Sequence, residues 1–326
     1  MTVSVILPIF KVEPFIERCV RSLMEQTFED VEFIFVDDAS PDNSVNLAKH
    51  VVSEYNRNVK FITHPVNKGL PGARNTGLAE ATGEFIYHCD SDDWLEPDLL
   101  EKMVKAANDN NADFVYCDFY LSFSEKERYM SQPHYTDKFD ALQKGVLTGN
   151  MKHNVWNKLI KHELYICNNI KSPEEYCNGG GGGEDFMIVK LLRLAEKVAH
   201  VPQALYHYNR TNVHAITKMN SHRDYEDIKN NADDIIAFLI EHPIPEPVFI
   251  NYFKLDVKLP FLMDRSREQY RRWKAWYPES NKYIVNNSYQ SLRTRFVELL
   301  AKWGFFSMVR LYGWTVDRLF YGIFYK

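Results

Sequence analysis

This chain of 326 residues lacks several features that would define a protein class at once. No run of about 18 apolar residues is present, so the sequence predicts no transmembrane helix. The start, Met1–Pro8, lacks the basic residues and long apolar core of a signal peptide. The cysteines are odd in number and show no close pairs, which argues against a disulfide framework and indicates a reducing cytoplasm. They are Cys19, Cys89, Cys117, Cys167 and Cys177.

Two common phosphate-binding signatures are also missing. No G-x-G-x-x-G follows the first expected strand, which disfavours a dehydrogenase, and no G-x-x-x-x-G-K-[ST] loop supports a P-loop ATPase. No Ser-His-Asp or Cys-His pattern indicates a covalent nucleophile. A composition of 45% hydrophobic and 25% charged residues is ordinary for a globular protein. The length predicts two domains, or one large domain with an appendage.

Acidic residues are scarce at one end of the chain. Residues 265–326 hold 12 Lys/Arg against 4 Asp/Glu, a local net charge of +8. Because the whole chain has a net charge of −5, residues 1–264 carry −13. The same segment is rich in aromatic residues, namely Trp273, Trp276, Trp303, Phe305, Phe306, Trp314, Phe320 and Phe324. Such a segment is either a helical appendage whose aromatic residues pack on the main domain or a contact with an anionic membrane surface. Nucleic acid is disfavoured as a partner.

Strands and helices alternate through the first hundred residues. The sequence predicts strands at 2–9, 31–36, 59–63 and 84–89, and helices at 14–26 and 45–55. A loop over 67–75 is expected to lead into a helix that ends near residue 81. Such βαβ units form a parallel, doubly wound α/β sheet, and ligands bind such sheets beyond the carboxyl ends of the strands.

Two acidic clusters fall at these predicted strand ends. Asp37-Asp38 follows the second strand, and Asp90-Ser91-Asp92-Asp93 follows the fourth. Carboxylates so close repel one another unless a cation or hydrogen-bond donors compensate them. Mg2+ and Mn2+ prefer such oxygen ligands and bridge them to diphosphates. The alternative is that Asp92 or Asp93 caps a helix beginning near residue 96.

The later segments are less regular. We expect helices at 99–108, 136–147, 186–195 and 221–242, strands at 114–119 and 198–208, and mostly helix at 249–265 and 289–325. A run of five glycines, Gly179–Gly183, predicts a mobile loop or lid. Glu184-Asp185 follows it at a helix start, where the acids either favour the helix dipole or supply a catalytic carboxylate.

Four segments stand in a recognisable order, namely Val5–Phe10, Val36–Asp42, Lys68–Asn75 and Asp90–Asp93. Together they resemble inverting family 2 glycosyltransferases of the GT-A fold, and the resemblance spans about residues 2–212. The resemblance implies a Rossmann-like, mixed and mainly parallel sheet flanked by helices in a catalytic domain of residues 1–218. Residues 219–326 would be a helical extension for acceptor, membrane-surface or oligomer contacts.

The resemblance also implies a role for particular residues. The donor-binding set is Pro8, Phe10 and Glu13 at the nucleoside, Asp38 at the uracil ring, Lys68 and Arg74 near the nucleotide, Asp90 near the ribose, Ser91 as a further nucleotide-sugar contact, and Arg210 at the diphosphate. Asp92, Asp90 and His207 would hold Mn2+ or Mg2+. In the base motif Glu184-Asp185, the second acid would deprotonate the acceptor hydroxyl. Lys11, where many relatives have Asn, and His214, where many have Ser, depart from the pattern.

The implied reaction is a single displacement from a UDP-sugar donor to a saccharide or lipid-linked saccharide acceptor. It would transfer a hexosyl or N-acetylhexosaminyl group in cell-surface polysaccharide biosynthesis, in the cytoplasm or at the inner face of the membrane. A homo-oligomer is left open. The alternatives are a nucleotidyltransferase, which would release pyrophosphate, and a non-catalytic nucleotide-sugar-binding protein.

Overall fold

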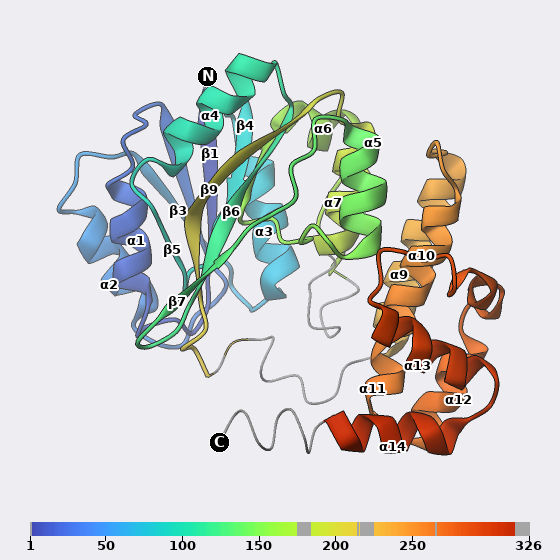
Figure 1. Cartoon of the computed structure of the whole chain (residues 1–326). Helices are drawn as coiled ribbons and strands as arrows, with labels where there is room; N and C mark the ends of the chain where they lie inside the picture. The colour runs from blue at the N-terminus through green and yellow to red at the C-terminus, as the bar shows by residue number, and fades with distance from the viewer. Residues whose placement is uncertain (1, 175–183, 214, 216–224, 265, 317–326) are drawn as a thin grey trace. The chain divides into compact units, whose positions relative to one another are not determined.

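The computed structural model describes residues 2–174, 184–213, 215, 225–264 and 266–316 (Figure 1). The chain forms two compact units, and each is described by itself. The first unit comprises residues 1–142 and 152–235, and the second comprises residues 143–151 and 236–326. The division into a catalytic domain of residues 1–218 and an extension of residues 219–326 stays a prediction.

The first unit is built on a mixed sheet of nine strands, ordered β3-β2-β1-β4-β8-β6-β9-β5 with β7 paired to β6. Most paired residues are parallel, in β1 with β2 and β4, β2 with β3, and β6 with β9, as the sequence predicted. The strands are β1 (Val3–Ile9), β2 (Val31–Asp37), β3 (Val59–Thr63), β4 (Phe85–His88), β5 (Trp94–Leu95), β6 (Phe114–Ser122), β7 (Glu127–Met130), β8 (Lys158–Lys161) and β9 (Val198–Asn209).

Helices flank the sheet because its central strands are apolar on both faces. In β1, Val5 and Leu7 belong to the main core with the buried face of α1, whereas Ile6 points toward α3. This alternation follows from the two-residue period of a strand. A side chain at Gly77 of α3 would lie 2.4 Å from Ile6, so a glycine permits this close approach. The helices of this unit are α1 (Ile16–Met24), α2 (Ser44–Val52), α3 (Gly69–Glu80), α4 (Leu99–Asn110), α5 (Lys138–Asp140), α6 (His162–Cys167) and α7 (Glu184–Leu194).

The second unit is helical in its described part, as predicted. Its Lys258 is buried and donates hydrogen bonds to the carbonyl oxygens of Trp276 and Tyr277, both at 3.2 Å, and to Asn281 Oδ1 at 2.5 Å. In the described residues, no helix is both long enough and apolar enough to span a bilayer. The elements are η2 (Val146–Thr148), α10 (Val248–Lys258), α11 (Pro260–Asp264), α12 (Arg267–Ala275), η4 (Pro278–Tyr283), α13 (Leu292–Lys302) and α14 (Phe306–Val316); α9 (Tyr225–Glu241) continues from the first unit.

Several predicted boundaries were wrong. The expected loop at 67–75 is already helical from Gly69, because proline is tolerated in the first turn of a helix. The expected helix at 136–147 is instead short α5 followed by a π-helical turn, η1 (Ala141–Gly145), and the 3-10 turn η2. The short strand β5 stands just before the expected helix start at 96, and α4 begins at Leu99. The glycine run Gly179–Gly183 lies outside the described residues.

Candidate active site

The carboxyl ends of β1, β2 and β4 meet at one edge of the sheet. The parallel register pairs Ile9 with Asp37, and Ile6 with His88. Phe10, Asp38 and the segment Asp90–Asp93 therefore emerge side by side, although up to about 80 residues separate them in sequence. This is the edge at which α/β sheets bind ligands.

The loop after β1 is tied to the loop after β2. The Lys11 backbone N–H donates to Ser40 Oγ at 2.9 Å, and the Asn43 N–H donates to Glu13 Oε2 at 3.0 Å. Lys11 has a φ of 54°, a left-handed conformation that asparagine adopts more readily than lysine. Pro8 is buried, whereas Phe10 is 38% exposed at the sheet edge. Within the predicted nucleoside set, Phe10 thus presents an exposed ring, and hydrogen bonds hold together the loops that follow β1 and β2.

Asp38 is held in a buried hydrogen-bond network. Its Oδ1 lies 2.8 Å from His64 Nδ1 and accepts the Lys68 backbone N–H at 2.8 Å. Because a carboxylate accepts, His64 Nδ1 donates, and the other ring nitrogen lies 2.8 Å from Thr76 Oγ1. Asp38 is only 3% exposed. The network fixes the direction of its carboxylate, and His64 was not predicted from the sequence.

Arg74 connects α3 to the acidic segment. Its side chain is 1% exposed, and its Nη2 donates to Asp90 Oδ1 at 2.7 Å. An arginine–carboxylate bond of this length is charge-assisted and directional. The structure therefore brings predicted residues Arg74 and Asp90 into direct contact, while Lys68 reaches the network through its backbone.

The turn Asp90–Asp93 is anchored from β9. The Tyr206 hydroxyl donates to Asp93 Oδ2 at 2.6 Å and accepts the Asp90 backbone N–H at 3.2 Å. The Asn209 N–H donates to Asp93 Oδ1 at 2.7 Å. Burial, together with the charges of Asp92 and Asp90, raises the pKa of Asp93 well above its usual range. Asp93 is therefore an internal support of the turn.

Asp92 points toward a different partner. The Asn212 side chain donates to Asp92 Oδ2 at 2.7 Å, and the Asn209 side chain donates to the Asp92 carbonyl at 3.0 Å. Burial raises the pKa of Asp92, and the nearby charge of Asp90 adds to the effect. Ser91 between the two acids is buried. The helix-cap alternative for Asp92 and Asp93 is wrong, because Asp98 stands at the N-cap of α4.

His207 and Arg210 lie at the end of β9. His207 Nδ1 is 2.8 Å from Glu127 Oε1, and its Nε2 is 2.9 Å from Glu96 Oε1. Both ring nitrogens are therefore engaged, and metal binding by His207 would require one of these bonds to break. The Arg210 N–H donates to the Ser122 carbonyl at 2.8 Å, and its guanidinium carbon lies 5.4 Å from the Tyr208 ring centre.

The acids fit a divalent cation only in combination with a substrate. In the described part of the chain, no three His, Cys, Asp or Glu side chains form a ready metal cluster. Asp90, with its side chain 23% exposed, and the half-buried Asp92 are two carboxylates on one turn, in which burial and then the charge of Asp90 raise the pKa of Asp92. Mg2+ and Mn2+ commonly use one or two protein carboxylates and complete their shell with substrate phosphates and water. The donor set fits that mode of binding.

The predicted base motif opens a helix. Glu184 and Asp185 are the first residues of α7, while their side chains lie outside the described part. The segment before the glycine run is tied to α3, since Asn75 Nδ2 donates to the Ser172 carbonyl at 2.9 Å and the Ser172 N–H donates to Asn75 Oδ1 at 2.8 Å. Ser172 Oγ also donates to Met187 Sδ of α7 at 3.3 Å. Asn75 thus connects the helix of Arg74 to the helix of the base motif.

Comparison with known proteins identifies the family of the chain. The family model described as "Glycosyl transferase family 2" matches residues 4–168, just over half of the chain. The chain therefore belongs to glycosyl transferase family 2. Its fold is GT-A, as the resemblance implied, with helices after the sheet.

Individual relatives cover different shares of the chain. The uncharacterized glycosyltransferase EpsJ of Bacillus subtilis is 33% identical over 226 residues, which is 67% of this chain and 63% of EpsJ. YibD of Escherichia coli, also an uncharacterized glycosyltransferase, is 26% identical over 300 residues, covering 89% and 77%. The match thus spans about three fifths of the length of EpsJ.

Solved structures share the fold at low sequence identity. TarS residues 1–349 of S. aureus, in complex with UDP, superpose with a TM-score of 0.68 at 18% identity, covering 100% of this chain and 93% of that one. The mannosyltransferase PcManGT of Pyrobaculum calidifontis, in complex with GDP-Man and Mn2+, gives 0.55 at 16% identity, covering 95% and 82%.

Proposed function

We propose that this chain is an inverting glycosyltransferase that moves a hexosyl or N-acetylhexosaminyl group from a UDP-sugar to an acceptor hydroxyl. The observation that carries the proposal is the braced turn Asp90–Asp93 beside Asp38 and exposed Phe10, at the ligand edge of a family 2 sheet. The TarS structures with UDP and UDP-GlcNAc support a uridine donor.

We assign the nucleoside to the edge between β1 and β2. Phe10 offers a ring face for the uracil, with Pro8 near the end of β1 and Glu13 in the loop that follows. Asp38 Oδ1 already receives His64 and Lys68, so Oδ2 is the oxygen that we assign to the uracil N–H. Because His64 fixes the carboxylate, this contact is positioned before the donor binds.

We assign the diphosphate to the acidic turn. Asp90 and Asp92 would hold Mn2+ or Mg2+, with Ser91 and Arg210 near the phosphates. When bound, the metal would stabilise the negative charge that develops on the leaving UDP. Arg74 holds Asp90 in place through its 2.7 Å bond. His207 would join the metal only by giving up Glu96 or Glu127.

We assign the base role to Asp185, with Glu184 beside it. As the acceptor oxygen bonds to the anomeric carbon, the bond from that carbon to UDP breaks and the configuration inverts. Asp185 takes the hydroxyl proton, a contribution of about 10^2–10^4-fold for a positioned general base. No covalent intermediate is required.

The acceptor and compartment are inferred more broadly. A saccharide or lipid-linked saccharide of a cell-surface polysaccharide is supported by a 37% identical match over 118 residues to the poly(ribitol-phosphate) beta-glucosyltransferase of Bacillus spizizenii, covering 35% of this chain and 18% of that one. In the described part, Cys19, Cys89 and Cys117 are buried free thiols, which supports a reducing cytoplasm.

The test is a screen of UDP-sugars with Mn2+ and candidate acceptors, in which UDP release is measured and the product anomer is identified by NMR. We expect one donor to release UDP with inversion, a loss of at least about 100-fold in Asp185→Asn, and normal turnover in Asp109→Asn, whose exposed acid pairs with Lys105. A parallel assay supplies UTP and sugar 1-phosphates, and release of pyrophosphate from UTP would identify a nucleotidyltransferase instead. Tight UDP binding without turnover would identify a non-catalytic binder.

A further inference from the structure

Helix α14 turns an apolar face toward solvent. Met308, Leu311 and Trp314 follow one another at three-residue intervals and are 50%, 62% and 52% exposed, while Val309 on the inner side is 2% exposed. Residues three apart are neighbours on a helix surface. Further exposed side chains continue this apolar patch, which we define as Leu292, Phe296, Trp303, Phe305, Met308, Leu311 and Trp314.

The patch is held on a rigid base. Phe306 packs against Tyr270 of α12 with ring centres 4.7 Å apart, and the Tyr270 hydroxyl donates to the Ala301 carbonyl at 2.8 Å. Phe296 of α13 meets Tyr312 of α14 edge to face at 6.3 Å. Three helices thus fix the exposed side chains in place.

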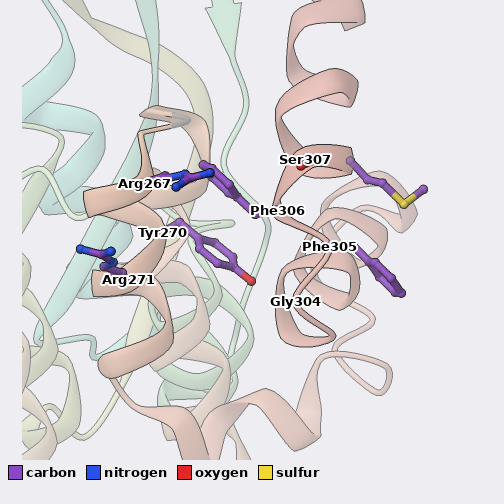
Figure 2. A pocket seen from close by; sticks show the side chains of 8 residues that line it. Arg267, Tyr270, Arg271, Gly304, Phe305, Phe306 and Ser307 are labelled. Carbon is purple, nitrogen blue, oxygen red and sulfur yellow. The ribbon is translucent and has the colours of Figure 1, made fainter.

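A hollow with cationic and aromatic walls lies next to the patch. It has a volume of about 440 Å³ and is lined by Arg267, Tyr270 and Arg271 of α12 and by residues 304–308. Figure 2 shows Arg267 and Tyr270 extending from α12 toward Phe306, and Phe305 turned outward. The hollow therefore combines guanidinium groups with apolar surface, which suits a ligand that has an anionic head and an apolar body.

The surrounding charge is positive with little compensation. Residues 266–316 contain nine Lys/Arg and three Glu. Two of the glutamates form ion pairs: Glu268 Oε1 lies 3.3 Å from Arg272 Nη2, and Glu279 Oε1 lies 2.7 Å from Lys254 Nζ. Glu298 is buried, and burial raises its pKa to about 8, so it is mostly uncharged at neutral pH. The exposed Arg267, Arg271, Lys274, Arg293, Lys302 and Arg310 dominate the field.

The positive charge and the apolar patch together determine which kind of partner fits this surface. A second copy of the same surface would bring like charges together, which opposes a self-interface. A nucleic acid would meet the cations and stack on aromatic faces, but Leu292, Met308 and Leu311 are aliphatic and offer no ring for a base. Hydrocarbon, aromatic rings and cations on one helical surface fit the boundary between lipid chains and anionic headgroups.

We propose that α12, α13 and α14 form a lipid-binding surface that docks this chain on an anionic bilayer. The apolar patch enters the headgroup boundary, and Arg267 and Arg271 bind lipid phosphates at the hollow. The interaction is peripheral and independent of donor binding at the sheet edge.

The test is co-sedimentation of the full chain, without nucleotide, with phosphatidylcholine vesicles that contain either no phosphatidylglycerol or 30 mol%. We expect binding to the anionic vesicles that weakens with salt, and much weaker binding to the neutral ones. Each neutralised arginine is expected to weaken binding about five-fold, so Arg267→Gln with Arg271→Gln should cost about 25-fold. The matched control Lys60→Gln with Lys105→Gln, at exposed lysines of the first unit, should bind normally.

A second pair separates apolar insertion from charge. Leu311→Ser with Trp314→Ser should weaken vesicle binding at least about ten-fold, whereas Val66→Ser with Ile166→Ser, at equally exposed apolar positions of the first unit, should not. Circular dichroism melting checks that each variant folds. Equal binding to neutral and anionic vesicles, wild-type binding by both patch variants, or binding to oligo-dT with none to vesicles would overturn the proposal. Dimerisation that the patch variants abolish, without vesicle binding, would overturn it in favour of a self-interface.

Discussion

Replacing Tyr206 by phenylalanine tests whether β9 holds the acidic turn in its working shape. The hydroxyl donates to Asp93 at 2.6 Å and accepts from the Asp90 backbone at 3.2 Å, so the change removes two buried hydrogen bonds and leaves the ring in place. The raised pKa of Asp93 favours its uncharged form, and a hydrogen bond between uncharged groups contributes about 0.5–1.5 kcal/mol. We therefore expect Tyr206→Phe, which removes two such bonds, to lower the free energy of unfolding by about 1–3 kcal/mol.

The functional effect follows from the same contacts. Without the hydroxyl, the Asp90 N–H loses its partner and Asp93 keeps only the Asn209 N–H among these donors, so the turn loses its anchor. Since Asp90 and Asp92 are the proposed metal-binding acids, we expect Mn2+-dependent UDP affinity to fall about ten-fold, or about 1.4 kcal/mol. Calorimetric titration measures this change.

The matched control is Tyr87→Phe. Tyr87 is also buried, but its hydroxyl donates to the Trp156 carbonyl at 2.5 Å instead of to the acidic turn. This variant should lose about 1–2 kcal/mol of stability and keep its UDP affinity. Equal UDP affinity in wild type, Tyr206→Phe and Tyr87→Phe, measured below each melting temperature, would refute the anchoring role.

Three further predictions concern stability. Burial raises the pKa of Glu298 to about 8, so the folded state holds this proton more tightly than the unfolded state. The free energy of unfolding therefore falls as the pH rises from about 4.5 toward 8, by at most about 1.4 kcal/mol per pH unit. Glu298→Gln should raise the melting temperature more at pH 8 than at pH 5. An unchanged pH profile would contradict this. Lys11→Gly at φ 54° should be neutral or stabilising by up to about 1 kcal/mol in denaturant titration, whereas a clear loss would disprove backbone strain there. Gly77→Ala would place a methyl 2.4 Å from Ile6 and should cost about 1–3 kcal/mol in the same titration, and a wild-type midpoint would show that α3 shifts freely.

Local sequence patterns predicted which strand ends form the candidate site. Alternating strands and helices are enough to place Asp38 and Asp90 at one sheet edge, because parallel strands end together. The contact between Arg74 and Asp90 agrees with the implied positions of both residues.

Local sequence patterns could not predict the residues that hold the site acids in place. Asn209 and Asn212 reach the acidic turn because two-residue β5 pairs with β9, and an element so short carries no periodic signal. His64 reaches Asp38 from the end of β3, where nothing in the sequence distinguishes it from a surface histidine. The early start of α3 was hidden by glycines and a proline, which usually indicate a loop. Such contacts depend on tertiary packing.

The most direct test of the central claim is calorimetric titration of UDP, with and without Mn2+, into wild type, Asp92→Ala and the control Asp109→Ala. The account predicts that Mn2+ strengthens UDP binding in wild type and in Asp109→Ala, and that Asp92→Ala loses this gain. Absence of UDP binding in wild type, or an equal response to Mn2+ in Asp92→Ala, would contradict the assignment of the acidic turn to a metal-bound nucleotide diphosphate.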